Sequence, residues 1–118
     1  MTKFSIIVVS LNTKKDFIRT IESIKKQKYK NYEIVIIDGK STDGTIKVIK
    51  LLKSKNIKFI IVKDNGIYDA MNKGIKNSKG DWIIFLNSGD IFYNNNTLKM
   101  IVQKNFENQD ILFGDTVI

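Results

Sequence analysis

Two acidic, glycine-containing loops each follow a short apolar run in this chain. The run Glu33–Ile37 leads into the segment Asp38–Gly44, and the run Trp82–Leu86 leads into Asn87–Asp90. Continuous Ile, Val and Phe runs of this length are typical of strands that are buried on both faces, as in parallel sheets. Ligands of such sheets bind beyond the carboxyl ends of the strands. We therefore expect both loops at one binding edge, with their carboxylates converging on a single crevice.

The acids of the first loop suit two kinds of contact. Asp38 ends its strand and precedes Gly39. A carboxylate at that position can accept a hydrogen bond from a donor on a flat ligand, such as a base N–H, and we favour this interpretation. Asp43 lies near the start of the next helix, where it either caps the helix or contacts a ligand, and both interpretations stay open.

The segment Asp64–Gly74 is unusually polar for the start of a helix. Asp69 and Lys73 are four residues apart, which places them together on one side of a helix. They form either an exposed ion pair or a contact to the ribose and phosphates of a nucleotide. Gly74, in the middle of this helix, costs about 1 kcal/mol relative to alanine, which indicates the close approach of another backbone.

Metal chemistry is restricted to oxygen ligands. The chain has no Cys and no His, which excludes disulfides, structural zinc and imidazole bases. Asp90, directly after the most hydrophobic strand, is placed to hold a divalent cation that bridges a diphosphate. The alternative is a simple turn with Asn87 and Gly89 in the positions that these residue types prefer. Any bound metal must be a hard ion such as Mg²⁺ or Mn²⁺.

The chain is basic, with a net charge of +8 from 20 Lys and Arg against 12 Asp and Glu. A basic surface can attract nucleic acid, anionic lipid or a phosphorylated ligand. The lysines are spread over positions 14–30, 40–63 and 73–79, which favours solvated outer faces of helices. We find neither an aromatic stacking platform nor a recognition motif, so we expect no nucleic-acid partner.

Strands and helices are expected to alternate. The expected strands are Phe4–Val9, Tyr32–Ile37, Lys58–Val62, Asp81–Leu86 and Ile111–Phe113. The expected helices are Lys14–Lys28, about Gly44–Lys53, about Ile67–Asn77 with Ile67, Met71, Gly74 and Ile75 inward, and one from about Thr97 with Leu98, Ile101, Val102 and Phe106 on its apolar face. This alternation predicts an α/β fold, a Rossmann-like and mostly parallel sheet with helices on both faces. At 118 residues we expect one domain, residues 1–118.

The ends of the chain give further expectations. No apolar run approaches the roughly 20 residues of a membrane span, and the first apolar stretch is too short for a signal peptide. A cytoplasmic protein is the simplest interpretation. The strand-like end at residues 111–118 leads us to expect that more sheet follows. Such an edge is prone to pair with another chain, which is compatible with a homodimer.

Four segments in order resemble the motifs of family 2 glycosyltransferases with a GT-A fold. They are Ser5–Asn12, Ile36–Thr45, Asp64–Gly74 and Gly80–Asp90, and the resemblance spans nearly the whole chain. The third segment most resembles bacterial enzymes that build polysaccharides such as colanic acid, capsule or O-antigen. The resemblance implies inverting transfer of a sugar from a nucleotide-diphosphate donor, usually UDP-linked, to a saccharide or lipid-linked acceptor. It is also compatible with peripheral association at the inner face of the plasma membrane.

The resemblance implies which residues contact the donor. Residues 10–12 and Asp38 would cradle the base, and Asp69 and Lys73 would lie along the ribose-diphosphate. The full set expected to bind the nucleotide-sugar is Ser10, Leu11, Asn12, Asp38, Ser41, Asp43, Gly66, Asp69, Lys73, Asn87 and Ser88. At positions 87–90 the family carries an Asp-x-Asp metal motif. Here the first acid is replaced by asparagine and the usual ligand position is Gly89, which leaves Asp90 as the expected metal ligand.

Catalysis itself is not expected from these residues. In the family that the chain resembles, the carboxylate that deprotonates the acceptor hydroxyl lies beyond the last strand expected here. We therefore expect donor binding without competent transfer, and no catalytic residue among the 118. The alternative from a different class is a non-catalytic nucleotide- or phosphate-binding module built on the same sheet.

Overall fold

The computed structural model describes residues 2–52, 54–104 and 111–113, the last three through their backbone. Strands and helices alternate along them, as the sequence predicts. In chain order they are β1 (Phe4–Ser10), α1 (Lys14–Lys25), β2 (Tyr32–Asp38), α2 (Thr45–Leu51), β3 (Ile57–Ile61), α3 (Ile67–Lys76), β4 (Trp82–Asn87), α4 (Thr97–Lys104) and β5 (Ile111–Phe113). Among these residues, no helix is both long enough and apolar enough to cross a membrane.

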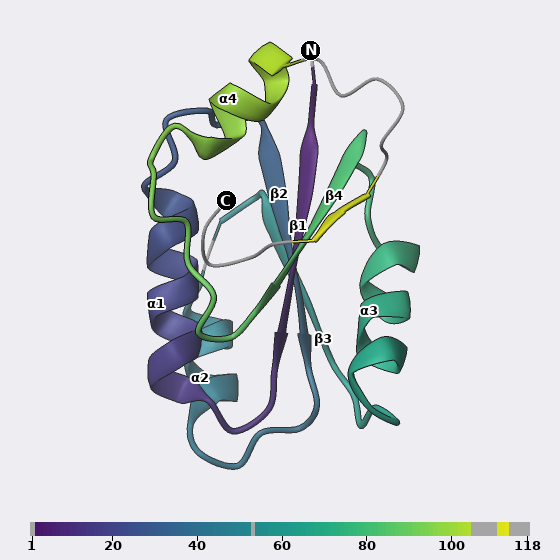
Figure 1. The fold of residues 1–118 in the computed structure, drawn as a ribbon. Coiled ribbons are helices and arrows are strands. Elements are labelled where there is room, and N and C mark those ends of the chain that lie inside the picture. The colour runs from purple at the N-terminus through teal and green to yellow at the C-terminus, as the bar shows by residue number, and fades with distance from the viewer. Residues whose placement is uncertain (1, 53, 105–110, 114–118) are drawn as a thin grey trace.

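The strands form one parallel sheet in the order β3-β2-β1-β4-β5. The chain therefore builds outward from β1 on one side, and then crosses to the other side of β1 to place β4 (Figure 1). The register sets Ser10 beside Asp38 and Val9 beside Asn87. This pairing brings the loops after β1, β2 and β4 to one edge. The strand order reverses at β1, and such reversals are where ligands bind in open α/β sheets.

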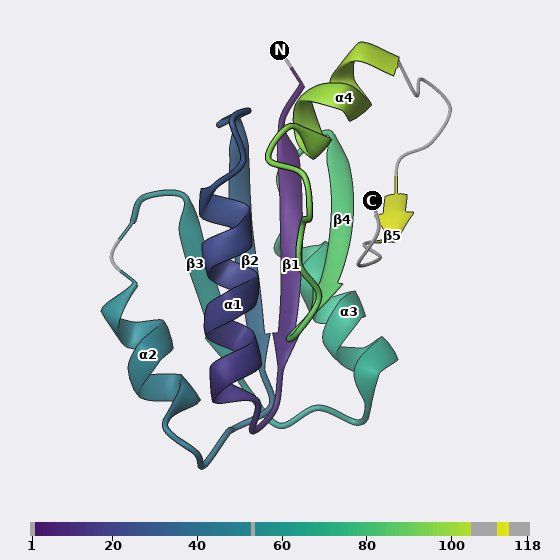
Figure 2. The same cartoon turned by 60° about the vertical axis from the view of Figure 1, so that its left-hand side comes forward.

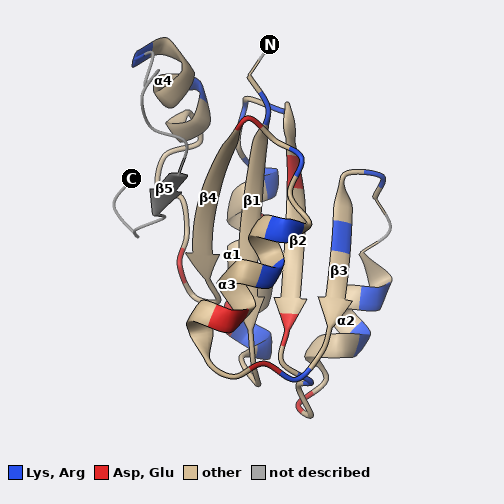
Figure 3. Cartoon of the chain, turned by 90° about the vertical axis from the view of Figure 1, so that its right-hand side faces the viewer, with Lys and Arg blue, Asp and Glu red and all other residues tan. Residues whose placement is uncertain are grey.

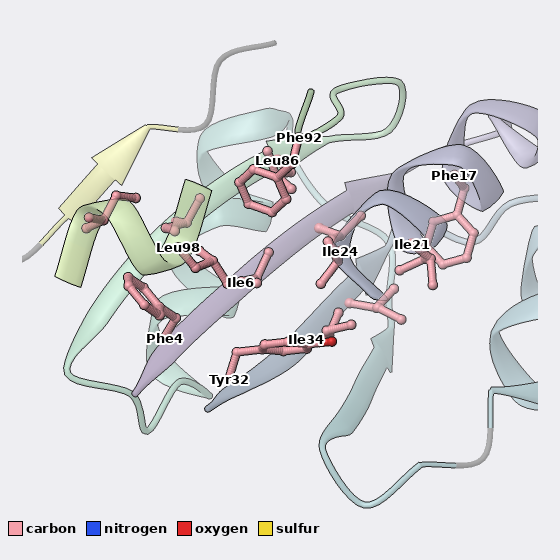
Figure 4. Packing of buried hydrophobic residues seen from close by; sticks show 14 of the residues in the cluster. Phe4, Ile6, Phe17, Ile21, Ile24, Tyr32, Ile34, Leu86, Phe92 and Leu98 are labelled. Atoms are coloured by element: carbon pink, nitrogen blue, oxygen red, sulfur yellow. The ribbon is translucent and has the colours of Figure 1, made fainter. Parts of the chain in front are cut away.

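Helices cover both faces of the sheet, which confirms the predicted fold class. Figure 2 shows α1 and α2 on one face and α3 on the other. Successive side chains of a strand point to opposite faces, so each strand contributes to two clusters. The cluster on the α1 face, drawn in Figure 4, includes Phe4, Ile6, Phe17, Ile21, Ile24, Ile34 and Leu86. The cluster on the α3 face includes Ile7, Val35, Ile37, Ala70 and Phe85.

Helix α3 lies very close to β1. A Cβ atom at Gly74 would be 2.5 Å from Cγ2 of Ile7, so a glycine is needed for this separation. The sequence predicts a close approach here, although the neighbour is a side chain and not a backbone. Ile67 was expected to point inward, and this is wrong because its side chain is 46% exposed. Ala70 takes that place, since Ile67 lies in the first turn, beyond the ends of the strands.

Helix α1 is shorter than the sequence suggests, because Gln27 turns into the core. The Gln27 side chain donates to the carbonyl oxygen of Asn94 at 2.7 Å and accepts from the Leu98 amide at 3.1 Å. These two bonds fasten the end of α1 to the start of α4. Phe106, expected on the apolar face of that last helix, lies outside the described residues.

Candidate functional site

A pocket of about 300 Å³ lies where the strand order reverses, beyond the C-terminal ends of β1 and β4 and beside the N-terminus of α3. Its walls combine four aliphatic residues with one glycine and five polar residues, and a mixture of apolar walls and placed polar groups is usual for a small-molecule site. The lining residues are Val9, Ser10, Leu11, Thr13, Asp64, Gly66, Ile67, Ala70, Asn87 and Ser88. Ser10, Leu11, Gly66, Asn87 and Ser88 are among the residues that the sequence predicts for the site.

Asp38 fastens the loop after β2 to the end of β1. Its Oδ1 accepts from the hydroxyls of Ser10, at 2.7 Å, and Ser41, at 2.6 Å. Its Oδ2 accepts from the Ser41 amide at 2.7 Å, and the residue is 0% exposed. The chain itself therefore occupies this carboxylate, which is not among the pocket-lining groups.

The side chain of Asn12 ties the loops after β1 and β2 together. Its Oδ1 accepts from the Thr42 backbone amide at 2.6 Å, and the backbone amide of Asn12 donates to the Ser41 hydroxyl at 2.9 Å. Asn12 has a φ of 53°, in the left-handed region that asparagine tolerates better than most residues. Asn12 and Ser41 thus hold the loops in place from outside the pocket lining.

Asp43 serves the starts of two helices. Its carboxylate accepts from the Lys14 amide at 3.0 Å, at the first residue of α1. It also accepts from the amide of Thr45, the first residue of α2, at 3.1 Å, and from the Thr45 hydroxyl at 2.5 Å. The hydroxyl bond is the main reason that the pKa of Asp43 is lowered from its ordinary value. Asp43 thus accepts hydrogen bonds from the first residues of two helices, as the capping interpretation predicts, and a ligand contact stays a prediction.

Asp69 and Lys73 form the ion pair that their spacing permits. The ammonium of Lys73 is 2.7 Å from Oδ2 of Asp69 and 3.3 Å from the carbonyl oxygen of Lys63. Oδ2 of Asp69 also accepts from the Asn65 amide at 2.9 Å. The Lys73 bond is the largest cause of the lowered pKa of Asp69. The pair lies outside the pocket lining, and its contact with a ligand stays a prediction. Acids at the end of β2 and the start of α3 are drawn red in Figure 3.

The loop after β4 is a tight turn fastened to α1. Oδ2 of Asp90 accepts from the Asn87 amide at 2.9 Å, and the Asp90 amide donates to the Asn87 carbonyl oxygen at 2.8 Å. The hydroxyl of Thr20, on α1, donates to the Asp90 carbonyl oxygen at 2.8 Å and accepts from the Gly89 amide at 2.9 Å. The turn interpretation of this loop is thus realised.

Asp38 and Asp90 both lie at this edge of the sheet, and their expected convergence on one crevice stays a prediction. Neither residue lines the pocket, although their neighbours Ser10 and Ser88 do. Asp38 is turned into the loop that it organises, and Asp90 is turned back onto its own strand end. Among the described residues, no group of three or more Asp and Glu side chains gathers in a way that could hold a metal ion.

Two polar pocket residues were not predicted from the sequence. Oδ1 of Asp64 accepts from the Gly66 amide at 3.0 Å. Thr13 precedes α1, yet its side chain makes no capping bond, and its hydroxyl oxygen is buried without a hydrogen-bond partner among the described residues. The Asp-Asn-Gly turn after β3 is a signal that could have found Asp64, because the turn directly precedes a helix. Nothing in the sequence distinguishes Thr13 from an ordinary helix-capping residue.

A family profile and the curated relatives of this chain all point to glycosyltransferases. A sequence profile of the family described as "Glycosyl transferase family 2" matches residues 5–118. A "PGL/p-HBAD biosynthesis glycosyltransferase" of Mycobacterium bovis BCG is 32% identical over 120 residues, which cover 98% of this chain and 47% of the relative. An "Uncharacterized glycosyltransferase" of Rickettsia felis is 39% identical over 117 residues, which cover 98% of this chain and 19% of the relative. The chain thus spans about half or less of the length of these relatives.

Solved structures agree with the predicted fold. Residues 1–349 of TarS from S. aureus, in complex with UDP-GlcNAc, match with a TM-score of 0.80 and 29% identity, over 89% of this chain and 31% of that one. The mannosyltransferase PcManGT from Pyrobaculum calidifontis, in complex with GDP-Man and Mn²⁺, matches with a TM-score of 0.80 and 19% identity, over 89% of this chain and 32% of that one. The second likeness shows a shared fold alone.

Proposed function

Because the chain belongs to glycosyl transferase family 2, we propose that it binds the nucleotide-sugar donor of a glycosyltransferase. The donor is UDP-linked, and the sugar passes with inversion to a saccharide or lipid-linked acceptor in the synthesis of cell-surface polysaccharide. The observation that supports this most is the pocket where the strand order reverses. TarS, which is 29% identical, was solved with UDP and with UDP-GlcNAc.

The predicted site residues divide between contact and support. Five of them line the pocket, and we assign these to contact the donor: Ser10, Leu11, Gly66, Asn87 and Ser88. Supporting bonds hold the loops around it, and the residues that make them are Asn12, Asp38, Ser41 and Asp43. The N-terminus of α3 borders the pocket, and the partial positive charge of a helix N-terminus favours an anion such as a diphosphate. Asp69 lies in the first turn of α3. Lys73, one turn further along, is the residue of this pair that would add positive charge near the phosphates.

The proposed function includes a divalent cation, and a single carboxylate, that of Asp90, is the group that would hold it at this edge. One carboxylate oxygen of Asp90, Oδ2, accepts from the Asn87 amide. The other oxygen accepts no hydrogen bond from the described residues. Hard oxygen ligands suit Mg²⁺ or Mn²⁺, and diphosphate oxygens complete such a shell. When bound, the cation neutralises charge that develops on the departing diphosphate. Asp90 is the residue that we assign to hold it.

The reaction needs a second half-site. Inverting transfer is an in-line displacement in which the acceptor hydroxyl attacks the anomeric carbon, a base takes its proton, and the nucleoside diphosphate leaves. The groups described above serve the leaving diphosphate, and we assign no base among them. We expect these 118 residues to bind the donor without transferring the sugar. A cytoplasmic location at the inner face of the plasma membrane, and a homodimer, are compatible with this function.

A non-catalytic nucleotide-binding module is the second candidate. The observation that favours it is that Gly89 occupies the position where the metal motif usually has an acid. The two candidates differ in what they recognise. A module of this kind would bind UDP and every UDP-sugar alike, whereas a donor site would distinguish among the sugars.

A thermal-shift panel tests the proposal, with UDP, UDP-sugars, GDP and GDP-mannose, each with and without Mn²⁺. A ligand at about 100 times its Kd stabilises a protein by about 2.7 kcal/mol, which raises the melting temperature by several degrees. We expect UDP and at least one UDP-sugar to give this shift. Asn87→Trp, which fills the pocket from an exposed position, should abolish the shift. Asn72→Trp, exposed on α3 away from the pocket, should keep it. If no nucleotide shifts the melting temperature, the proposal is wrong.

A further inference from the structure

Gly39 leaves room for a carboxylate that comes from another loop. A Cβ atom at position 39 would lie 2.9 Å from Oδ2 of Asp64 and 3.4 Å from Cδ1 of Leu11. Gly39 is not among the residues with positive φ, so a side chain at position 39 would meet the Asp64 carboxylate and would not strain the backbone. The Asp64 carboxylate therefore stands beside the end of β2, where a side chain at position 39 would begin.

Asp64 has one oxygen to offer a ligand. Its Oδ1 is held by the Gly66 amide at the start of α3, which fixes the orientation of the carboxylate. Its Oδ2 accepts no hydrogen bond from the described residues and lies beside Gly39, and Asp64 is one of the residues that line the pocket. At the end of the adjacent strand, each carboxylate oxygen of Asp38 already accepts at least one hydrogen bond, from Ser10 or Ser41. Of these two acids, Asp64 is the one that lines the pocket and has an oxygen that accepts no hydrogen bond from the described residues.

The pocket walls suit a flat ring. The side chains of Leu11 and Ile67 both line the pocket, and they are 53% and 46% exposed. A ring placed against them would remove apolar surface from water. The hydroxyl oxygen of Thr13, which also lines the pocket, is buried and has no hydrogen-bond partner in the part of the chain that the structure describes. A buried hydroxyl in that state is a cost that a ligand carbonyl can relieve by accepting a hydrogen bond.

We propose that Oδ2 of Asp64 accepts the ring N–H of a uracil base packed against Leu11 and Ile67. This inference rests on the proposed function and assigns its base-recognising residue. Uracil presents a single ring N–H, which matches the single free oxygen. Guanine presents two adjacent donors, its ring N–H and its amino group, which call for both oxygens of a carboxylate. Because the Gly66 amide holds Oδ1, the site favours uridine over guanosine nucleotides.

Calorimetric titration of the 118-residue chain tests this with three probes: UDP, N3-methyl-UDP and GDP. In Asp64→Asn the amide oxygen keeps the bond from the Gly66 amide, so the NH₂ group faces the base and opposes its N–H. We expect Asp64→Asn to weaken UDP binding about tenfold or more and to leave N3-methyl-UDP binding unchanged. Asp81→Asn is the matched control, because that carboxylate also accepts one backbone amide, from Lys3 at 2.9 Å, but at the opposite edge of the sheet.

A second variant keeps the test independent of the charge change. Gly39→Ala retains Asp64 but pushes its carboxylate away, so we expect weaker UDP binding with no loss of N3-methyl-UDP binding. The assignment of Asp64 is overturned, while the donor site stands, if Asp64→Asn binds UDP as tightly as the original sequence does. It is also overturned if N3-methylation of UDP lowers the affinity by the same factor in Asp64→Asn and in the original sequence. If the unchanged chain binds no nucleotide, the donor site is overturned and this inference with it. Circular dichroism confirms that each variant is folded.

Discussion

The loops after β2 and β3 meet at one edge of the sheet and use their acids in opposite ways. After β2, Asp38 and Asp43 accept hydrogen bonds from the chain, and these bonds hold loops and helix starts. After β3, Asp64 lines the pocket, and one of its oxygens accepts from the Gly66 amide while the other accepts no hydrogen bond from the described residues. The comparison teaches that an acid at a binding edge does not by itself indicate a ligand contact. What matters is which oxygens the fold leaves without a partner.

The largest expected effect separates Asp38 from Asp64 by stability. Asp38→Ala removes a buried acceptor and leaves the Ser41 amide and the Ser10 hydroxyl without it. We expect a loss of about 3 kcal/mol in the free energy of unfolding, because bonds to a charged acceptor are strong and buried donors are costly to leave unpaired. Asp64→Asn keeps the Gly66 bond and should change stability by less than about 0.5 kcal/mol. Urea denaturation measures both, and equal losses would remove the distinction between the two loops.

A smaller effect is expected from Lys73, whose charge is already partnered by Asp69 at 2.7 Å. Lys73→Ala should weaken UDP binding about two- to threefold through the lost positive charge, and uridine binding should not change. The difference should fade as salt is raised from about 0.05 M to about 0.5 M, since salt screens such interactions. Titrations with UDP and uridine at both salt concentrations measure this. A loss that is equal for uridine, or independent of salt, would place Lys73 in direct contact with the nucleoside.

The smallest effect concerns acid. The pKa values of Asp43 and Asp69 are lowered in the fold, chiefly by bonds from Thr45 and Lys73. Each carboxylate therefore contributes stability that is fully present above the ordinary aspartate pKa, near about 4, and is lost as the pH falls through the lowered value. Melting temperatures measured from pH 7 down to pH 3 should stay level at first and decline below about pH 4. Asp43→Asn should decline less steeply over that acid range, and a slope identical to that of the unchanged chain would contradict this account.

Most of the fold follows from the pattern of apolar residues. The runs Phe4–Val9 and Tyr32–Ile37 are buried on both faces in the structure, and runs of this kind predict parallel strands without any tertiary information. The errors lie at helix ends and at helix orientation. Helix α1 ends early because Gln27 bonds to a distant loop, and Ile67 is exposed because α3 starts beyond the sheet. A local sequence pattern reveals neither the Gln27 bond nor the point at which α3 starts relative to the sheet.

The site is less predictable than the fold. The sequence correctly places several residues at the C-terminal edge of the sheet, because the ends of the strands determine their position. These residues are Ser10, Leu11, Gly66 and the segment 87–88. The roles of Asp38 and Asp64 depend on which hydrogen bonds each carboxylate makes across the chain, and the sequence spacing does not encode them. Thr13 shows the same limit, since a capping residue and a pocket residue look identical in the sequence.

The central claim is that the pocket at the reversal of strand order binds a uridine diphosphate group. Titration of the ¹⁵N-labelled chain with UDP, followed by amide NMR spectra, tests it most directly. We predict that the amides of Ser10, Leu11, Gly66 and Ser88 shift most, while those at the opposite edge, such as Asp81, stay in place. Largest shifts at Arg19 and Lys26, which line a separate pocket between α1 and the loop after β4, would contradict the account, as would the absence of any shift.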